Sequence, residues 1–220
     1  MEEVLQLYAL AYDAKRPLVC FDERPCFLIG DLVVPLPMQS GKPKREDYHY
    51  SKHGSCALLM AFEPHTGRRW AKVYARRTAQ EYTDFMRQLD KQFPEADAIT
   101  LVQDNLNTHQ GGSFYAHLPP EQAFALSQRF DMHFTPKGAS WLNMRAGPVG
   151  AVLPKTIEIE FSALSRQCLD RRIPCQQQLE HEVLAWVKAR NAKRTTVAWQ
   201  FSIQTARDKL QRHYHKCRRS

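Results

Sequence analysis

The sequence predicts a mixed α/β fold in which one β-sheet carries helices on both faces. Short apolar runs typical of buried strands alternate with amphipathic helical patterns along the chain. Two of the runs flank a tight turn, as the strands of a hairpin do. The chain has 220 residues, of which 43% are hydrophobic and 25% charged, enough for one large domain with a core.

The predicted strands are short runs of apolar residues bounded by turn signals. They cover residues 18–21, 55–62, 69–74, 98–103 and 132–134. The turn at 63–67 joins the second run to the third, which alternates as a strand paired back on its neighbour. Residues 31–53 are rich in Pro, Gly, Lys and Tyr, which predicts an extended loop or ribbon.

The predicted helices follow a period of 3.6 residues. They cover residues 2–12, 78–93, 114–118, 120–130, 157–169, 176–191 and 205–214. Thr78 is the expected N-cap of the second helix, because Glu81 stands at capping-box spacing. In the fifth helix one face is expected to be apolar, and it carries Ile157, Phe161, Leu164 and Cys168.

The composition favours an anionic partner and excludes a membrane span. Lys and Arg exceed Asp and Glu by 31 − 23 = 8, and nucleic acid is the first candidate. Five basic clusters are candidate contacts to a DNA backbone, although for any one pair a solvated surface is the better explanation: 42–45, 68–69, 76–77, 171–172 and 207–219. No run approaches the roughly 20 apolar residues that cross a bilayer.

The six cysteines form no C-x-x-C pair and are too sparse for a disulfide framework, which indicates a reduced, intracellular protein. His213, His215 and Cys217 lack a second half with zinc spacing, and we interpret them as part of an exposed basic tail.

Two of the predicted strands end in an aspartate, Asp22 and Asp104. In an open α/β sheet, ligands bind at the carboxyl ends of the strands, so the two carboxylates converge if the strands are neighbours. Paired carboxylates suit Mg²⁺, which prefers hard oxygen ligands. The alternative, that each aspartate only caps a turn or a helix, is about as well supported.

Several segments resemble the catalytic domain of DDE transposases, in the branch of bacterial insertion sequences within the mariner-like superfamily. The resemblance covers about residues 4–214. The segments that carry it are FDE at 21–23, QDNLNTH at 103–109, HFTPK at 133–137, SWLNM at 140–144 and IEFSALSRQCLDRR at 159–172. It implies an RNase H-like fold, followed by C-terminal helices.

The resemblance also implies a third catalytic acid, a glutamate on the helix that follows SWLN. Residue 146 is Ala, and the family pattern resumes only at Ile157, so Glu158 matches the third acid and residues 145–156 (RAGPVGAVLPKT) are an atypical insertion. Thr156 is a candidate N-cap, which would put Glu158 in the first helical turn. Two hypotheses stay open: the insertion is a surface loop, or it moves Glu158 out of reach. Glu160 lies about 200° further round the helix and is expected to face elsewhere.

The implied activity is metal-dependent cleavage of a DNA phosphodiester followed by strand transfer. Asp22, Asp104 and Glu158 would bind two Mg²⁺ (or Mn²⁺) ions. Candidate supporting or DNA-contacting residues are Asn105, Asn107, His109, Lys137, Trp141 and Asn143. A packed Trp141 and a His109 bonded to backbone are the alternatives. Glu23 is expected to point away from Asp22 and to be structural.

The predicted organisation is a linker helix at 1–16, a catalytic domain at 17–214 and a basic tail at 215–220. DNA is the expected partner, both as element ends and as target, with a second copy of the chain as a candidate. The residues before the first predicted strand are too few for the helix-turn-helix region of the family. This region is therefore expected to be missing or to belong to a separate polypeptide. A cytoplasmic, nucleoid-associated bacterial protein is the expected setting. The alternatives are an inactive remnant that binds DNA loosely or partners an intact transposase, and a nuclease that does not join DNA.

Overall fold

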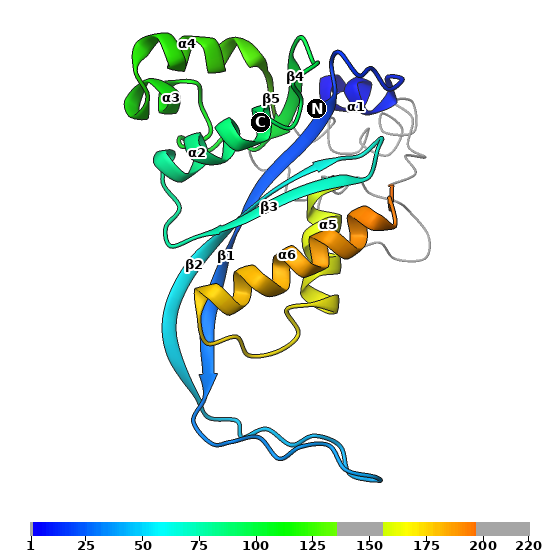
Figure 1. Cartoon of the computed structure of the whole chain (residues 1–220), viewed down its shortest axis with the longest axis vertical. Helices are drawn as coiled ribbons and strands as arrows, with labels where there is room; N and C mark the ends of the chain where they lie inside the picture. The colour runs from blue at the N-terminus through cyan, green and yellow to red at the C-terminus, as the bar shows by residue number, and fades with distance from the viewer. Residues whose placement is uncertain (1, 136–155, 197–220) are drawn as a thin grey trace, which may run out of the picture.

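The computed structural model describes residues 2–135 and 156–196, and in them a five-stranded mixed sheet forms the centre of the molecule (Figure 1). The strand order is β3-β2-β1-β4-β5. The strands are β1 (Leu18–Asp31), β2 (Tyr50–Glu63), β3 (Arg68–Tyr74), β4 (Ile99–Gln103) and β5 (Phe130–Phe134). Strands β1, β2 and β3 pair antiparallel, whereas β1, β4 and β5 pair parallel. The predicted mixed sheet and its hairpin are confirmed.

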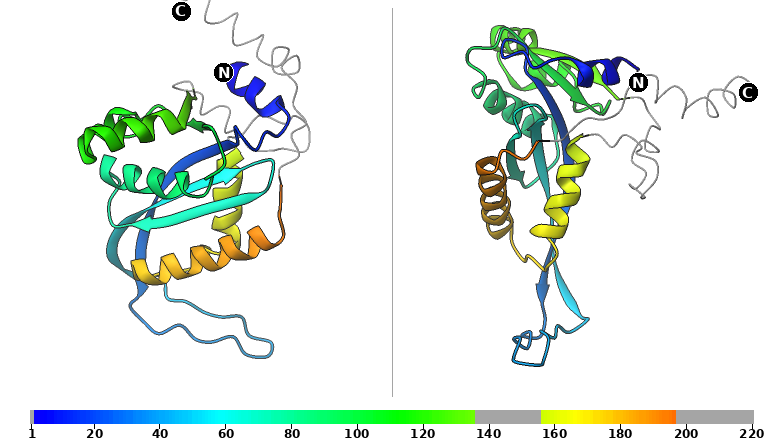
Figure 2. Two further views of the ribbon diagram at one scale, coloured as in Figure 1. Left: turned by 45° about the horizontal axis from the view of Figure 1, so that its top comes forward. Right: turned by 90° about the vertical axis from the view of Figure 1, so that its right-hand side faces the viewer.

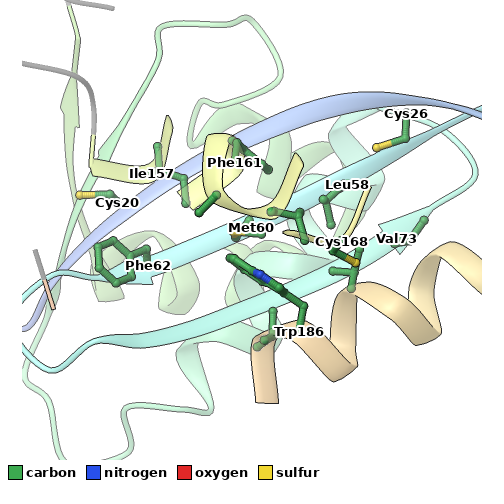
Figure 3. Packing of buried hydrophobic residues seen from close by; sticks show 14 of the residues in the cluster. Cys20, Cys26, Leu58, Met60, Phe62, Val73, Ile157, Phe161, Cys168 and Trp186 are labelled. Atoms are coloured by element: carbon green, nitrogen blue, oxygen red, sulfur yellow. The ribbon is translucent and has the colours of Figure 1, made fainter. Parts of the chain in front are cut away.

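Six helices in the described ranges cover the two faces of this sheet. They are α1 (Glu2–Ala9), α2 (Ala79–Asp90), α3 (Gly112–His117), α4 (Pro120–Arg129), α5 (Thr156–Gln167) and α6 (Gln176–Ala192). Residues of α1, α5 and α6 share one hydrophobic core with alternate side chains of β1 and β2. Figure 3 shows residues of α5 and α6 packed against β1 and β2 in this core. Residues of α2, α3 and α4 share a second core with the intervening side chains. Helices on both faces are therefore confirmed, and the predicted apolar face of α5 is buried.

Strands β1 and β2 are longer than the sequence predicts. Their antiparallel pairing runs from Cys20↔Phe62 to Asp31↔Tyr50, so β1 does not end at Asp22. The prediction that β1 delivers its acid at a strand end was wrong, because a partner strand continues the ladder through residues whose side chains are polar. Only the parallel pairing between β1 and β4 stops nearby, at Cys20↔Val102.

Beyond β1 and β2, the chain between them forms a long ribbon that projects from the body of the molecule (Figure 2). Two isolated bridges, Leu36↔Arg45 and Gln39↔Lys42, hold it together. Arg172 ties its base to the body, because its guanidinium contacts Asp31 at 2.7 Å and the backbone oxygen of Asp47 at 2.6 Å. The predicted ribbon is confirmed, and Arg172 is engaged within the protein.

Helix α2 has the predicted capping box. The Thr78 side chain accepts a hydrogen bond from the backbone of Gln80, while the Glu81 side chain accepts one from the Thr78 backbone at 3.0 Å. We expect Thr78→Ala to lower the free energy of unfolding by about 1 kcal/mol, because the backbone N–H of Gln80 loses the hydroxyl oxygen that accepts its hydrogen bond. Urea unfolding measures this, and Thr78→Ser, which keeps the hydroxyl, is the control. Equal losses in both variants would contradict the capping role.

No helix in the described ranges is long and apolar enough to cross a membrane. The cysteines that the structure describes are free thiols: Cys20, Cys26, Cys56 and Cys168 are buried and Cys175 is exposed. The predicted helix at 205–214, the tail at 215–220 and the insertion up to residue 155 lie outside the described residues.

Candidate active site

Asp22 and Asp104 each come two residues after the last parallel pair of β1 and β4, Cys20↔Val102. The paired residues of β1 and β4 differ by 100 − 18 = 82 in residue number, and 104 − 22 is also 82. Asp104 directly follows Gln103, the last residue of β4. Because neighbouring strands are about 4.8 Å apart, the same register continued by two residues would bring these two aspartates close together. Part of the predicted convergence therefore follows from the topology.

Asp104 begins a loop that folds back on itself and places the His109 ring against the Asp104 carboxylate. The His109 Nδ1 atom lies 2.5 Å from the Asp104 Oδ1 atom, and the His109 ring is completely buried. The backbone N–H of His109 donates to the Leu106 oxygen at 3.0 Å, which closes the turn. Burial lowers the pKa of His109, but the hydrogen bond to Asp104 and the interaction with Glu23 outweigh it, so this pKa is raised to about 9.

Glu23 points to the opposite side of β1 from Asp22, as strand alternation predicts. Its side chain is only 3% exposed, and its Oε2 atom lies 3.3 Å from the His109 Nε2 atom. Its Oε1 atom lies 3.2 Å from the guanidinium of Arg77, whose side chain is half exposed. Sequence reasoning missed these contacts. Glu23, Asp104 and His109 were visible in the sequence as two acids and one histidine that could contact one another. No rule of spacing, however, predicts a contact between residues 23 and 109.

Helix α5 carries Glu158 in its first turn, over the sheet face that Asp22 shares with Cys20. Figure 3 shows Ile157 beside Cys20 at the N-terminal end of this helix. Arg24 fastens the same helix to β1, because its guanidinium donates to the Ser165 hydroxyl. Helix α5 begins at Thr156, so Thr156 is its first helical residue. The prediction of Thr156 as the N-cap, which precedes the first helical residue, was wrong. The Glu158 side chain is half-buried.

Glu160 faces away from this edge, as predicted, and is completely buried. Its Oε1 atom lies 2.9 Å from Arg69 and 3.0 Å from Arg190, and its Oε2 atom accepts from the same two residues. Arg69 is itself 1% exposed and also donates to the Thr195 oxygen at 2.7 Å. The prediction of Arg69 as a DNA-contacting residue was wrong, because its guanidinium is used to join β3, α5 and α6 inside the protein.

The described part of the site offers oxygen donors, which suits a hard divalent cation. Asp22, Asp104 and Glu158 are carboxylates that belong to β1, the end of β4 and the first turn of α5. Within residues 2–135 and 156–196, no three His, Cys, Asp or Glu side chains form a preformed metal-binding group. Lys137, Trp141 and Asn143 lie outside the described residues.

The loop after Asp104 lines an open pocket of about 390 Å³, together with Arg77. Asn105 and Asn107, both predicted to support the site or touch the substrate, are exposed in this loop and line the pocket. The pocket combines the amide groups of Asn105 and Asn107, on the loop that follows Asp104, with the cation of Arg77. Such a lining can take a phosphate group.

Comparison with known proteins supplies a family for this geometry. A family model described as DDE superfamily endonuclease matches residues 17–180. The solved strand transfer complex of Mos1 is similar, with a TM-score of 0.53 and 12% identity over 86% of this chain and 51% of that chain. The Mos1 mariner paired end complex with Mn gives a TM-score of 0.50 and 14% identity over 86% and 52%. The chain thus matches about half the length of these structures, and the likeness confirms the predicted RNase H-like fold. A search of curated proteins found no significant match.

Proposed function

The chain belongs to the DDE superfamily of endonucleases, and from this premise we propose that it is a transposase catalytic domain that cuts DNA and joins the cut end to target DNA. The proposal includes a bacterial insertion sequence as the mobile element. Mg²⁺ or Mn²⁺ is the proposed cofactor, in agreement with the Mn named for one similar structure.

One observation supports this function above the others: Asp22 and Asp104 each come two residues after the last parallel pair of β1 and β4, Cys20↔Val102, and Glu158 lies in the first turn of α5, which packs on the face of β1 that carries Cys20. We assign these three carboxylates as the ligands of two ions. When bound, the ions would activate the attacking hydroxyl and stabilise the leaving oxygen of the phosphodiester. The protein contributes by holding the carboxylates on rigid elements.

The remaining residues of the site would bind and orient the DNA strand. Arg77, Asn105 and Asn107 line the pocket beside Asp104, where they would hold a phosphate group. The surplus of positive charge would attract the DNA without reading its sequence. Unlike Arg69 and Arg172, the Arg76 side chain is exposed, and it is a candidate backbone contact.

A nicking assay on supercoiled DNA tests the proposed function. We expect the parent chain to nick DNA with Mg²⁺ or Mn²⁺ and to stop when EDTA removes the metal. Asp104→Asn should lower the rate at least about 100-fold, because a charged metal ligand is lost. Asp170→Asn, which changes an exposed acid on the loop after α5, should leave the rate unchanged.

A second assay offers oligonucleotides with a free 3′-hydroxyl and scores their joining to a target plasmid. Joined products support a transposase. Nicking without joining would identify a nuclease, and an inactive parent chain that still binds DNA would identify a remnant.

A further inference from the structure

A row of charged side chains runs through the protein from Arg77 to Asp104. Arg77 contacts the Glu23 Oε1 atom at 3.2 Å, Glu23 contacts the His109 Nε2 atom at 3.3 Å, and the His109 Nδ1 atom lies 2.5 Å from Asp104. The two outer side chains are 51% and 27% exposed, whereas Glu23 and His109 are 3% and 0% exposed. Two buried groups therefore connect the candidate metal ligand to the pocket wall.

The packing around His109 fixes the direction of its ring. The ring lies between Phe21, at 5.2 Å between ring centres, and Tyr82, stacked at 5.0 Å. The Gln103 amide donates to the His109 backbone oxygen at 2.8 Å, and the Tyr82 hydroxyl donates to that same Gln103 side chain at 2.9 Å. These contacts hold the ring with its Nδ1 atom directed at Asp104.

The position of Glu23 is difficult to explain by stability alone. A carboxylate buried beside the second core costs free energy that an apolar side chain there would not. Neither Glu23 Oε1 nor His109 Nε2 has a hydrogen bond of good geometry to any residue that the structure describes. The contact of Glu23 Oε1 with Arg77 and the contact of Glu23 Oε2 with His109 Nε2 are therefore ionic. What Glu23 does provide is a negative group on the far side of the His109 ring, which holds the ring between two carboxylates.

We propose that Glu23 and His109 are positioning residues that fix the orientation of the Asp104 carboxylate for metal binding. The inference rests on the proposed function, in which Asp104 is a ligand. His109 engages the Oδ1 atom of Asp104, and this sets the plane of the carboxylate and the direction of its Oδ2 atom. Hydrogen-bonded partners behind a ligand typically change metal affinity 10- to 100-fold. Glu23 acts through His109 and does not touch the metal.

Binding of Mn²⁺ to the full chain, followed by electron paramagnetic resonance of the free ion, tests this inference without an activity measurement. We expect Glu23→Gln and His109→Leu to weaken Mn²⁺ binding about 10- to 100-fold. His109→Asn, whose amide can donate at the Nδ1 position, should restore part of the affinity. Glu63→Gln, which changes another buried acid of the same sheet, is the matched control and should bind Mn²⁺ as the parent does.

Thermal unfolding of each variant separates a positioning role from a loss of structure. A folded Glu23→Gln variant with parental Mn²⁺ affinity overturns the inference, while Asp104→Asn in the same assay still reports on the proposed function. If Glu23→Gln does not fold, the two His109 variants test the inference. Equal Mn²⁺ affinities in His109→Leu and His109→Asn would then overturn it. A parent chain that neither binds Mn²⁺ nor nicks DNA overturns both proposals.

Discussion

Glu158→Gln is expected to lower metal-dependent DNA cleavage at least about 100-fold while leaving the unfolding midpoint within a few degrees of the parent. The half-buried Glu158 side chain lies in the first turn of α5, and the apolar residues of that helix, not this one, anchor it to the sheet. Replacing a carboxylate by an amide keeps its size and removes the charge that a divalent cation needs. The nicking assay and a thermal melt of the same sample measure the two quantities.

Ser162→Ala is the control for this prediction, because Ser162 is an exposed residue of the same helix and should change neither quantity. The atypical insertion before α5 makes the result informative. A Glu158→Gln variant that cuts DNA at the parental rate would show that Glu158 is not the third acid, and would contradict the assignment drawn from the family pattern.

Glu160→Gln, unlike Glu158→Gln, is expected to lower stability. We expect the free energy of unfolding to fall by about 3–5 kcal/mol. Glu160 is the shared partner of Arg69 and Arg190, and both arginines contact it from within the protein. Without its charge, the buried guanidinium of Arg69 has no counter-ion at that position, although it keeps its bond to the Thr195 oxygen. Urea unfolding at neutral pH measures the loss.

The matched control uses an ion pair at the surface. Arg171 and Glu182 lie 2.5 Å apart with side chains 48% and 25% exposed, and Glu182→Gln should cost less than about 1 kcal/mol. Similar losses in Glu160→Gln and Glu182→Gln would mean that the buried pair does not hold α5 and α6 on β3. The two predictions for α5 together distinguish the face that serves the site from the face that serves the fold.

Local sequence was sufficient to predict most of the elements. The capping box of Thr78 and Glu81 predicted the start of α2, and the apolar spacing from Ile157 to Cys168 predicted the buried face of α5. Glycine at the β2–β3 turn allowed the same kind of prediction, since Gly67 has a φ of 70°. These features depend on residues a few positions apart, where short-range geometry decides the conformation.

The sequence by itself also determined the candidate ligands Asp22 and Asp104, because acids beside buried parallel strands converge wherever those strands are neighbours. Only the tertiary structure decided that β1 continues past Asp22, that Arg69 is buried against Glu160, and that Glu23 meets His109. The physical reason is that these contacts join residues 19 or more positions apart. Their pairing depends on which strands and helices pack together, and a local pattern carries no information about that.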